Sequence, residues 1–172
     1  LLLLIIRGGK EQNIYHVLMY TICAVCNIAY FGISIAKSTD TAIICNNITY
    51  LGGVFLPLCV LVRHADLCGV KIHKGIIAAL MTGSIAVFGI VFSTGYSDLY
   101  YKNVGIKKVY GAVQMVKEYG RAHNTYKILL VVYVIALTAV MVKAFRDKNR
   151  IPKKTVFSMM AVILGPCVVY LS

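Results

Sequence analysis

Five long apolar runs constrain this chain more than any other feature. Each is close to the length of about 20 residues that a helix needs to cross a bilayer. The runs cover roughly residues 13–36, 41–62, 75–94, 125–142 and 155–172, and residues 1–6 resemble the tail of an earlier run. Apolar residues make up 59% of the 172-residue chain and charged residues 14%, whereas soluble domains hold about 45–50% and 25%. We therefore expect an all-α integral membrane protein, a polytopic helix bundle that is incomplete at both ends.

The basic residues predict how the bundle is oriented. The net charge is +12, from 18 basic and 6 acidic residues, and most of the basic residues lie in the connectors between runs. The connectors at residues 7–12, 63–74 and 143–154 hold more of them than the connectors at residues 37–40 and 95–124, although these last two together span more residues. By the positive-inside rule we expect loops 7–12, 63–74 and 143–154 to be cytoplasmic and loop 95–124 to be extracellular. Because these charges border apolar runs, we expect a lipid bilayer and no nucleic acid as their partner.

The connector at residues 95–124 is too long to be a simple turn. Two loosely alternating stretches, "KKVY" and "AVQMVKEY", flank Gly111 and predict a short β-hairpin. The connector also carries five tyrosines, namely Tyr96, Tyr100, Tyr101, Tyr110 and Tyr119. Tyrosine is enriched at membrane interfaces, so these side chains either anchor the loop or form a cap that contacts a ligand above the helices.

The chain offers little for catalysis or metal binding. It contains no P-loop, no H-E-x-x-H and no G-x-S-x-G motif, and none of its six acidic residues lies in the middle of an apolar run. The four histidines are scattered, and the Cys23-x-x-Cys26 pair has no second pair to complete a zinc site. We expect no catalytic residue, metal or cofactor in these 172 residues, and whether the parent protein is an enzyme stays open.

Polar residues inside the second full run stand out against their apolar neighbours. Asn46 and Asn47 are followed closely by Tyr50. Amides within a bilayer need partners, and hydrogen bonds between helices can supply them. One interpretation is structural, with these side chains joining helices. The other is a polar ligand pocket near the outer leaflet, formed by Asn46, Asn47 and Tyr50.

The same run contains Gly52, Gly53 and Pro57. Proline cannot donate a hydrogen bond to the carbonyl four residues earlier, which here belongs to Gly53. The weakened turn therefore falls on the two glycines and predicts a kink or hinge. Neighbouring helices can compensate for the missing bond, so the segment can stay within the membrane.

Several ordered stretches resemble the seven-transmembrane N-terminal sensor region of bacterial histidine kinases, which also precedes diguanylate cyclases. The second-to-third helix region carries Ser38, then Tyr50-Leu51-Gly52, then Pro57. The stretch from the second loop strand into the following helix carries Tyr119-Gly120 and His123. That stretch reads "VKEYGRAHNTYKILLVVY", and two further stretches resemble the family in order, namely "FSTGYSDLYYKNV" before it and "RDKNRIPKKTVFSMMAVILGPCVVYL" after it. On this basis residues 1–172 represent six of seven helices, with the first truncated.

One departure from the family pattern limits what carries over. The family often has His-His where this chain has Ser97-Asp98. A ligand or metal role of those histidines therefore cannot be assigned here. We expect the ligand-binding side chains among Asn46, Asn47, Tyr50, Tyr96, Tyr100, Tyr101, Tyr119 and His123.

The resemblance implies a sensory input region of the cell membrane. It would detect a small extracellular or membrane-dissolved ligand and signal to a cytoplasmic kinase, or another output domain, in the same chain. Sensor kinases that resemble this family are expected to act as homodimers. The alternatives are a transporter or channel subunit and a structural subunit of a larger membrane complex. The lack of intramembrane carboxylates argues against an ion-coupled transporter.

Overall fold

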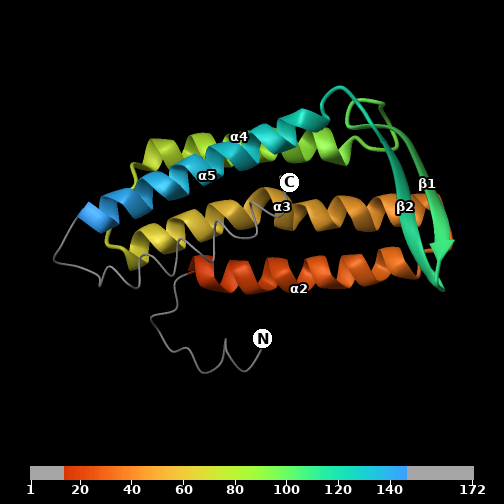
Figure 1. Cartoon of the computed structure of the whole chain (residues 1–172), viewed down its shortest axis with the longest axis horizontal. Coiled ribbons are helices and arrows are strands. Elements are labelled where there is room, and N and C mark those ends of the chain that lie inside the picture. The colour runs from red at the N-terminus through yellow and green to blue at the C-terminus, as the bar shows by residue number, and fades with distance from the viewer. Residues whose placement is uncertain (1–13, 147–172) are drawn as a thin grey trace.

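The computed structural model describes residues 14–146 as four long helices and one β-hairpin (Figure 1). The helices are α2 (Ile14–Ser34), α3 (Thr39–Leu67), α4 (Lys74–Phe92) and α5 (His123–Arg146), and the strands are β1 (Tyr101–Val109) and β2 (Ala112–Tyr119). All four helices are long and apolar enough to cross a membrane. The predicted tail at 1–6, the loop at 7–12, residues 147–154 and the last run at 155–172 lie outside the described residues.

The helix boundaries differ from the predicted runs where polar residues extend a helix beyond the apolar segment. α3 continues to Leu67, so the predicted loop 63–74 shrinks to residues 68–73. Arg63 and Asp66 pair at 3.1 Å on this extension, and Ala65 between them is buried. α5 likewise runs on to Arg146 and shortens the predicted loop 143–154. Hydropathy alone places a helix end too early when the final turns are amphipathic.

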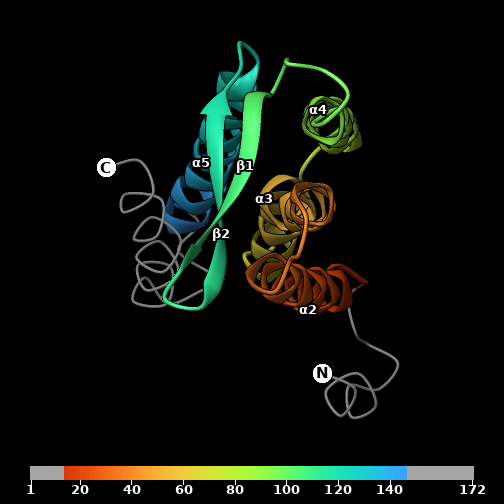
Figure 2. The same cartoon turned by 90° about the vertical axis from the view of Figure 1, so that its right-hand side faces the viewer.

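α3 lies against the other helices and forms the middle of the bundle (Figures 1 and 2). It packs closely on α2 through glycine–cysteine contacts. A methyl group added at Gly32 or at Gly52 would lie 2.7 Å from the Sγ atom of Cys45 or Cys26 respectively. Small residues at these positions let the two backbones approach, as is common between membrane helices. On its opposite side α3 buries Val54, Leu58 and Leu61 toward α4 and α5.

A buried polar cluster joins three helices in the middle of the bundle. The hydroxyls of Ser84 on α4 and Tyr133 on α5 lie 2.7 Å apart. Ser84 also donates to the Val54 carbonyl of α3 at 3.3 Å, and Tyr133 approaches the Leu80 carbonyl at 3.4 Å. Val54 follows Gly53, whose carbonyl lacks the Pro57 donor. The neighbouring helices thus supply polar contacts next to the weakened turn. α3 stays helical through Pro57 and bends near its middle (Figure 1).

The predicted hairpin is present and is longer than expected. β1 begins at Tyr101 rather than near Lys107 and pairs antiparallel with β2. Tyr110 and Gly111 connect the strands with φ angles of 48° and 84°, which is typical of a two-residue type I′ turn. The hairpin crosses one end of the bundle, from the α4 and α5 side to α2 (Figures 1 and 2).

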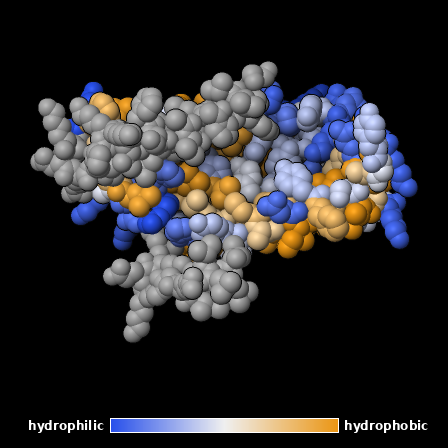
Figure 3. Space-filling model, turned by 60° about the horizontal axis from the view of Figure 1, so that its bottom comes forward, coloured by the Kyte–Doolittle hydropathy of each residue, from blue (hydrophilic) through white to orange (hydrophobic). Residues whose placement is uncertain are grey.

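The surface supports a membrane-embedded helix bundle. Ile28, Phe31, Ile44, Ile85 and Ile135 each expose more than half of their surface. On the face shown, hydrophobic residues lie along the middle of the described helices, and hydrophilic residues gather at the hairpin end and at the opposite end (Figure 3). Apolar side chains with this exposure are suited to contact lipid. The predicted class, an all-α polytopic membrane bundle with a small β-hairpin, is confirmed.

Candidate functional site

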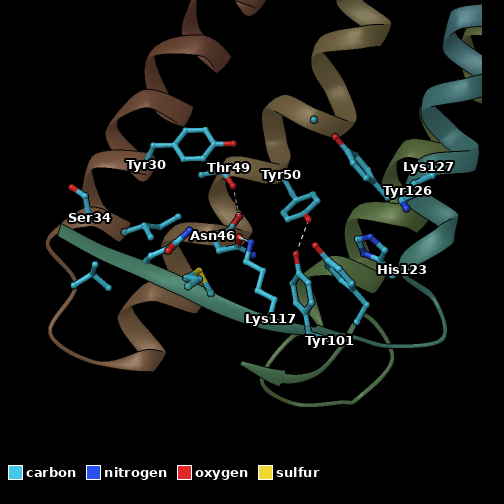
Figure 4. A pocket seen from close by; sticks show the side chains of 16 residues that line it. Tyr30, Ser34, Asn46, Thr49, Tyr50, Tyr101, Lys117, His123, Tyr126 and Lys127 are labelled. Atoms are coloured by element: carbon cyan, nitrogen blue, oxygen red, sulfur yellow. Dashed lines mark hydrogen bonds between the residues drawn. The ribbon is translucent and has the colours of Figure 1, made fainter. Parts of the chain in front are cut away.

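A cavity of about 610 Å³ lies between the hairpin and the ends of α2, α3 and α5. Tyr30 comes from α2, Asn46 and Tyr50 from α3, Tyr101 and Lys117 from the hairpin, as Figure 4 shows. Binding sites for small molecules typically measure about 300–1,000 Å³. The cavity is therefore large enough for a compact organic ligand.

One face of α3 forms the floor of the cavity. Asn46, Thr49, Tyr50 and Gly53 line it, and their spacing of three, four and seven residues places them on the same side of a helix. Asn46 is only 2% exposed. Gly53 leaves room for the Tyr126 hydroxyl, which an added methyl group would overlap.

The inner face of β2 covers this floor. Val113, Met115 and Lys117 alternate with the more exposed Gln114, Val116 and Glu118. The inner three residues line the cavity together with Gln114. Lys117 Nζ donates to Asn46 Oδ1 at 2.6 Å and lies 5.3 Å from the centre of the Tyr101 ring. Burial lowers the pKa of the Lys117 ammonium below its ordinary value, because removal from water disfavours the charged form.

Tyrosines connect the hairpin to the helices beside the cavity. The hydroxyls of Tyr50 and Tyr101 lie 2.7 Å apart (Figure 4). The Tyr50 ring also meets Tyr100 and Tyr126 edge to face, with centroids 5.4 and 5.2 Å away. Edge-to-face pairs contribute about 0.5–1.5 kcal/mol beyond the burial of their area. Burial raises the pKa of the Tyr101 hydroxyl, so it remains a neutral hydrogen-bonding group.

His123 begins α5 and forms the side of the cavity nearest Tyr119. The two rings stack with centroids 3.9 Å apart. The backbone leading to His123 is fixed by Gly120, whose N–H donates to the Tyr100 carbonyl at 2.8 Å. A methyl group at Gly120 would collide with the carbonyl oxygens of Asp98 and Leu99. Only glycine permits this close approach of the second strand's end to the residues that precede the first strand.

The structure brings together five of the eight side chains that the sequence predicted as ligand-binding. Asn46, Tyr50, Tyr101, Tyr119 and His123 line one cavity. The other three do not line it. Asn47 and Tyr100 are buried beside it, at 5% and 0% exposure, and Tyr96 is 93% exposed.

The candidate hinge residues divide between two surfaces. Gly53 faces the cavity and Tyr126, whereas Gly52 faces Cys26 of α2. Pro57 lies one turn further along α3, away from the cavity lining.

Sequence reasoning missed several cavity residues, above all Tyr30, Lys117, Tyr126 and Lys127. The sequence contains two periodic patterns that indicate some of these positions. Lys117 follows Val113 and Met115 at the period of two that marks one face of a strand. Tyr126 and Lys127 lie three and four residues after His123, which places them on the same face of a helix.

The position that departs from the family's His-His pattern lies outside this cavity. Ser97 donates to the Ser93 hydroxyl at 2.9 Å, and Asp98 is exposed. Within residues 14–146, no group of three or more His, Cys, Asp or Glu side chains is arranged to hold a metal ion. The cavity combines hydrogen-bond donors, cations and aromatic rings, a combination suited to binding a ligand.

The comparisons with known proteins identify the family. The family model described as the N-terminal 7TM region of histidine kinase matches residues 1–172. Comparison with curated proteins and with solved structures gave no significant match. The family match spans the whole sequence, and the four membrane-length helices with a small hairpin agree with it. The chain therefore belongs to the N-terminal seven-transmembrane region of histidine kinases, a multi-pass membrane region that serves as a sensory input domain.

Proposed function

We propose that this region detects a small ligand in the cavity beneath the hairpin and passes a conformational signal to a cytoplasmic kinase in the same chain. The observation that carries the proposal is that α2, α3, α5 and both strands all line one cavity. A ligand there contacts α2, α3, α5 and both strands of the hairpin at once. It can bias a two-state switch only by binding the two states unequally, and a site shared by several elements allows such a difference.

The contact between Gly53 and Tyr126 offers a route from the cavity to the bundle. It joins the weakened turn of α3 to α5, and α5 continues to Arg146 at the opposite end. A shift of Tyr126 on ligand binding would thus move α5 relative to α3. In this proposal Gly52, Gly53 and Pro57 form the hinge, and the signalling unit is a homodimer, as expected for a sensor kinase.

The proposal places the hairpin outside the cell. Residues 95–124 are then extracellular, and residues 7–12, 63–74 and 143–154 are cytoplasmic. Tyr110 at the tip of the hairpin is fully exposed, so Tyr110→Cys should react with a membrane-impermeant thiol reagent in intact cells. Ser34 lines the cavity at the same end of the bundle, so Ser34→Cys should react with the reagent more slowly than Tyr110→Cys. Reaction of Tyr110→Cys only after the cells are opened would overturn this orientation.

The signalling role can be tested while the ligand is unidentified. In the full-length parent protein, Gly53→Ala should change histidine autophosphorylation, because the added methyl group displaces Tyr126. Overpacking of about 1–3 kcal/mol can shift a two-state equilibrium by roughly 5- to 150-fold.

Two variants control this experiment. Gly89→Ala places the same methyl group in open space on α4 and should leave autophosphorylation unchanged. Tyr126→Phe removes the closest atom and leaves two ring carbons at 3.1 and 3.2 Å from the added methyl group. In the Gly53→Ala protein it should therefore return most of the change in autophosphorylation toward the wild-type level. Equal activity in all four proteins, or a parent protein without a kinase domain, would reject the proposal. A water-filled pathway and measurable solute flux would favour the transporter or channel alternative instead.

A further inference from the structure

Among the described residues, the cavity carries positive charge without a matching carboxylate. Lys117 and Lys127 line it, and none of its described lining residues is Asp or Glu. Burial and the two lysines lower the pKa of the His123 ring, so His123 contributes a neutral polar group. Glu118, next to Lys117 along β2, faces outward and accepts from Asn103 at 2.9 Å. Among residues 14–146, the ion pair found is that of Arg63 and Asp66 at the opposite end of α3. A ligand entering the cavity therefore meets a positive electrostatic potential.

Lys117 is only partly compensated for its removal from water. Its ammonium has three donor hydrogens, and it donates to one amide oxygen, that of Asn46. The Tyr101 ring adds a weak cation–π contact at 5.3 Å. Buried cations in proteins are normally paired with an anion. The remaining donors of Lys117 can therefore hold an anionic group that enters the cavity.

Two neighbouring polar atoms are also unsatisfied. Asn46 Nδ2 and His123 Nδ1 are both buried and make no hydrogen bond of good geometry within the described residues. Both residues line the cavity. Unsatisfied buried groups in a native protein are uncommon and call for an explanation. Beside Lys117, Asn46 Nδ2 can only donate. The Tyr101 hydroxyl lies near Asn46 but completes no hydrogen bond of good geometry with Nδ2, so an acceptor that enters the cavity can fill this place.

The rest of the lining is suited to the apolar part of an organic ligand. Tyr30, Tyr50, Tyr101 and Tyr126 surround the cavity together with Ile33 and Met115. Aromatic faces bind planar or aliphatic groups by stacking and burial. The volume of about 610 Å³ exceeds what a bare inorganic anion would need.

We propose that the cavity binds a small organic anion whose carboxylate or similar group accepts from the remaining donors of Lys117 and from Asn46 Nδ2, with its apolar body among the tyrosines. This inference rests on the proposed sensory function and names the chemical class of its ligand. The anion can come from the extracellular medium or from the membrane as an amphiphile, and the two sources share the same head-group chemistry.

The first measurement compares matched probes on the full-length parent protein in zwitterionic nanodiscs. Benzoate and benzamide have nearly the same shape and differ in charge. Decanoate represents a membrane-dissolved anion. Isothermal titration should show saturable binding of benzoate, decanoate or both, and binding of benzamide at least about tenfold weaker. The tighter of the two anions identifies the source. Equal binding of benzoate and benzamide, or no binding of either anion, would overturn the proposal.

Lysine variants then locate the anion. Lys117→Met should weaken binding of the better anion by at least about tenfold. Lys107→Met removes an exposed charge from β1 of the same hairpin and should leave the affinity unchanged. Lys117→Arg retains the charge and should retain most of the affinity. An equal loss in Lys107→Met and Lys117→Met would indicate attraction by the general surface charge and would overturn the assignment.

Asn46→Asp separates ligand binding from a purely structural role of Lys117. The new carboxylate would pair with Lys117 and replace the Nδ2 donor with a negatively charged acceptor, which repels an entering anion. Anion binding should fall at least about tenfold, while hydrogen exchange shows β2 still docked. Anion affinity equal to the wild type in a docked Asn46→Asp protein would show that Lys117 is only a tether. If no anion binds while the Gly53→Ala protein still alters autophosphorylation, the ligand class fails and the sensory function stands.

Discussion

Two buried polar sites in this bundle differ in how completely they are satisfied. In the middle, the two hydroxyl hydrogens of Ser84 and Tyr133 are shared between the contact of the two hydroxyls and the carbonyls of Val54 and Leu80, so that each hydroxyl has a partner. At the hairpin end, Asn46 Nδ2 and His123 Nδ1 lack partners within the described residues, and Lys117 is held by an amide oxygen. A satisfied network stabilises a unique packing, whereas a partly satisfied one costs stability. The difference separates a site that joins helices from a site that can accept a ligand.

The largest expected effect tests what holds the hairpin in place. In Gly120→Ala the new methyl group meets the backbone carbonyls of Asp98 and Leu99, which cannot rotate away as a side chain could. We expect a loss of about 3 kcal/mol in the free energy of unfolding and faster hydrogen exchange in both strands. Gly105→Ala, which adds a methyl group in open space on β1, is the control. Comparable exchange in the two variants would show that the Gly120 contact does not seat the hairpin.

The next largest effect concerns the polar cluster of Ser84 and Tyr133 in the middle of the bundle. Ser84→Ala removes the hydroxyl that joins Tyr133 to Val54 and should cost about 1–2 kcal/mol of unfolding free energy in a detergent titration. Tyr133→Phe should cost a similar amount. Because the two hydroxyls bond to each other, the double variant should lose less than the sum of the two. Strict additivity would contradict a shared network.

The smallest effect on stability is expected at the hairpin end. Asn46→Leu combined with Lys117→Met replaces an incompletely satisfied polar pair with apolar groups. Such replacements are often neutral or stabilising, so we expect unfolding free energy within about 0.5 kcal/mol of the wild type or above it. A loss as large as that of Ser84→Ala would remove the distinction between the two sites.

The sequence predicted the membrane helices and the hairpin turn because both depend on local signals. Runs of about 20 apolar residues specify spanning helices, and Gly111 marks a turn. Asn46 and Tyr50 were found because polar residues stand out in an apolar run. The end of α3 was predicted too early, because the helix continues through the charged residues Arg63 and Asp66 beyond the apolar segment. Lys117 was missed because the period of two shows only that it shares a strand face with Val113 and Met115, and tertiary packing decides that this face lies over the cavity.

The neighbouring glycines show the same limit. Sequence reasoning treated Gly52 and Gly53 as one hinge. In the structure Gly52 permits the approach of α2, and Gly53 permits the approach of Tyr126 from α5. Which face of a helix a glycine occupies follows from the periodicity, but which helix lies opposite does not.

Filling the cavity covalently tests the central claim, that this cavity controls the kinase, and it does not require the natural ligand. Ser34→Cys, in the full-length protein with the exposed Cys23 changed to Ser, places a thiol in the cavity lining. Modification by a benzyl methanethiosulfonate, with its extent verified by mass spectrometry, should change histidine autophosphorylation several-fold. The same modification of Tyr110→Cys at the exposed hairpin tip should leave it unchanged. Complete modification of Ser34→Cys with unaltered autophosphorylation would contradict the account.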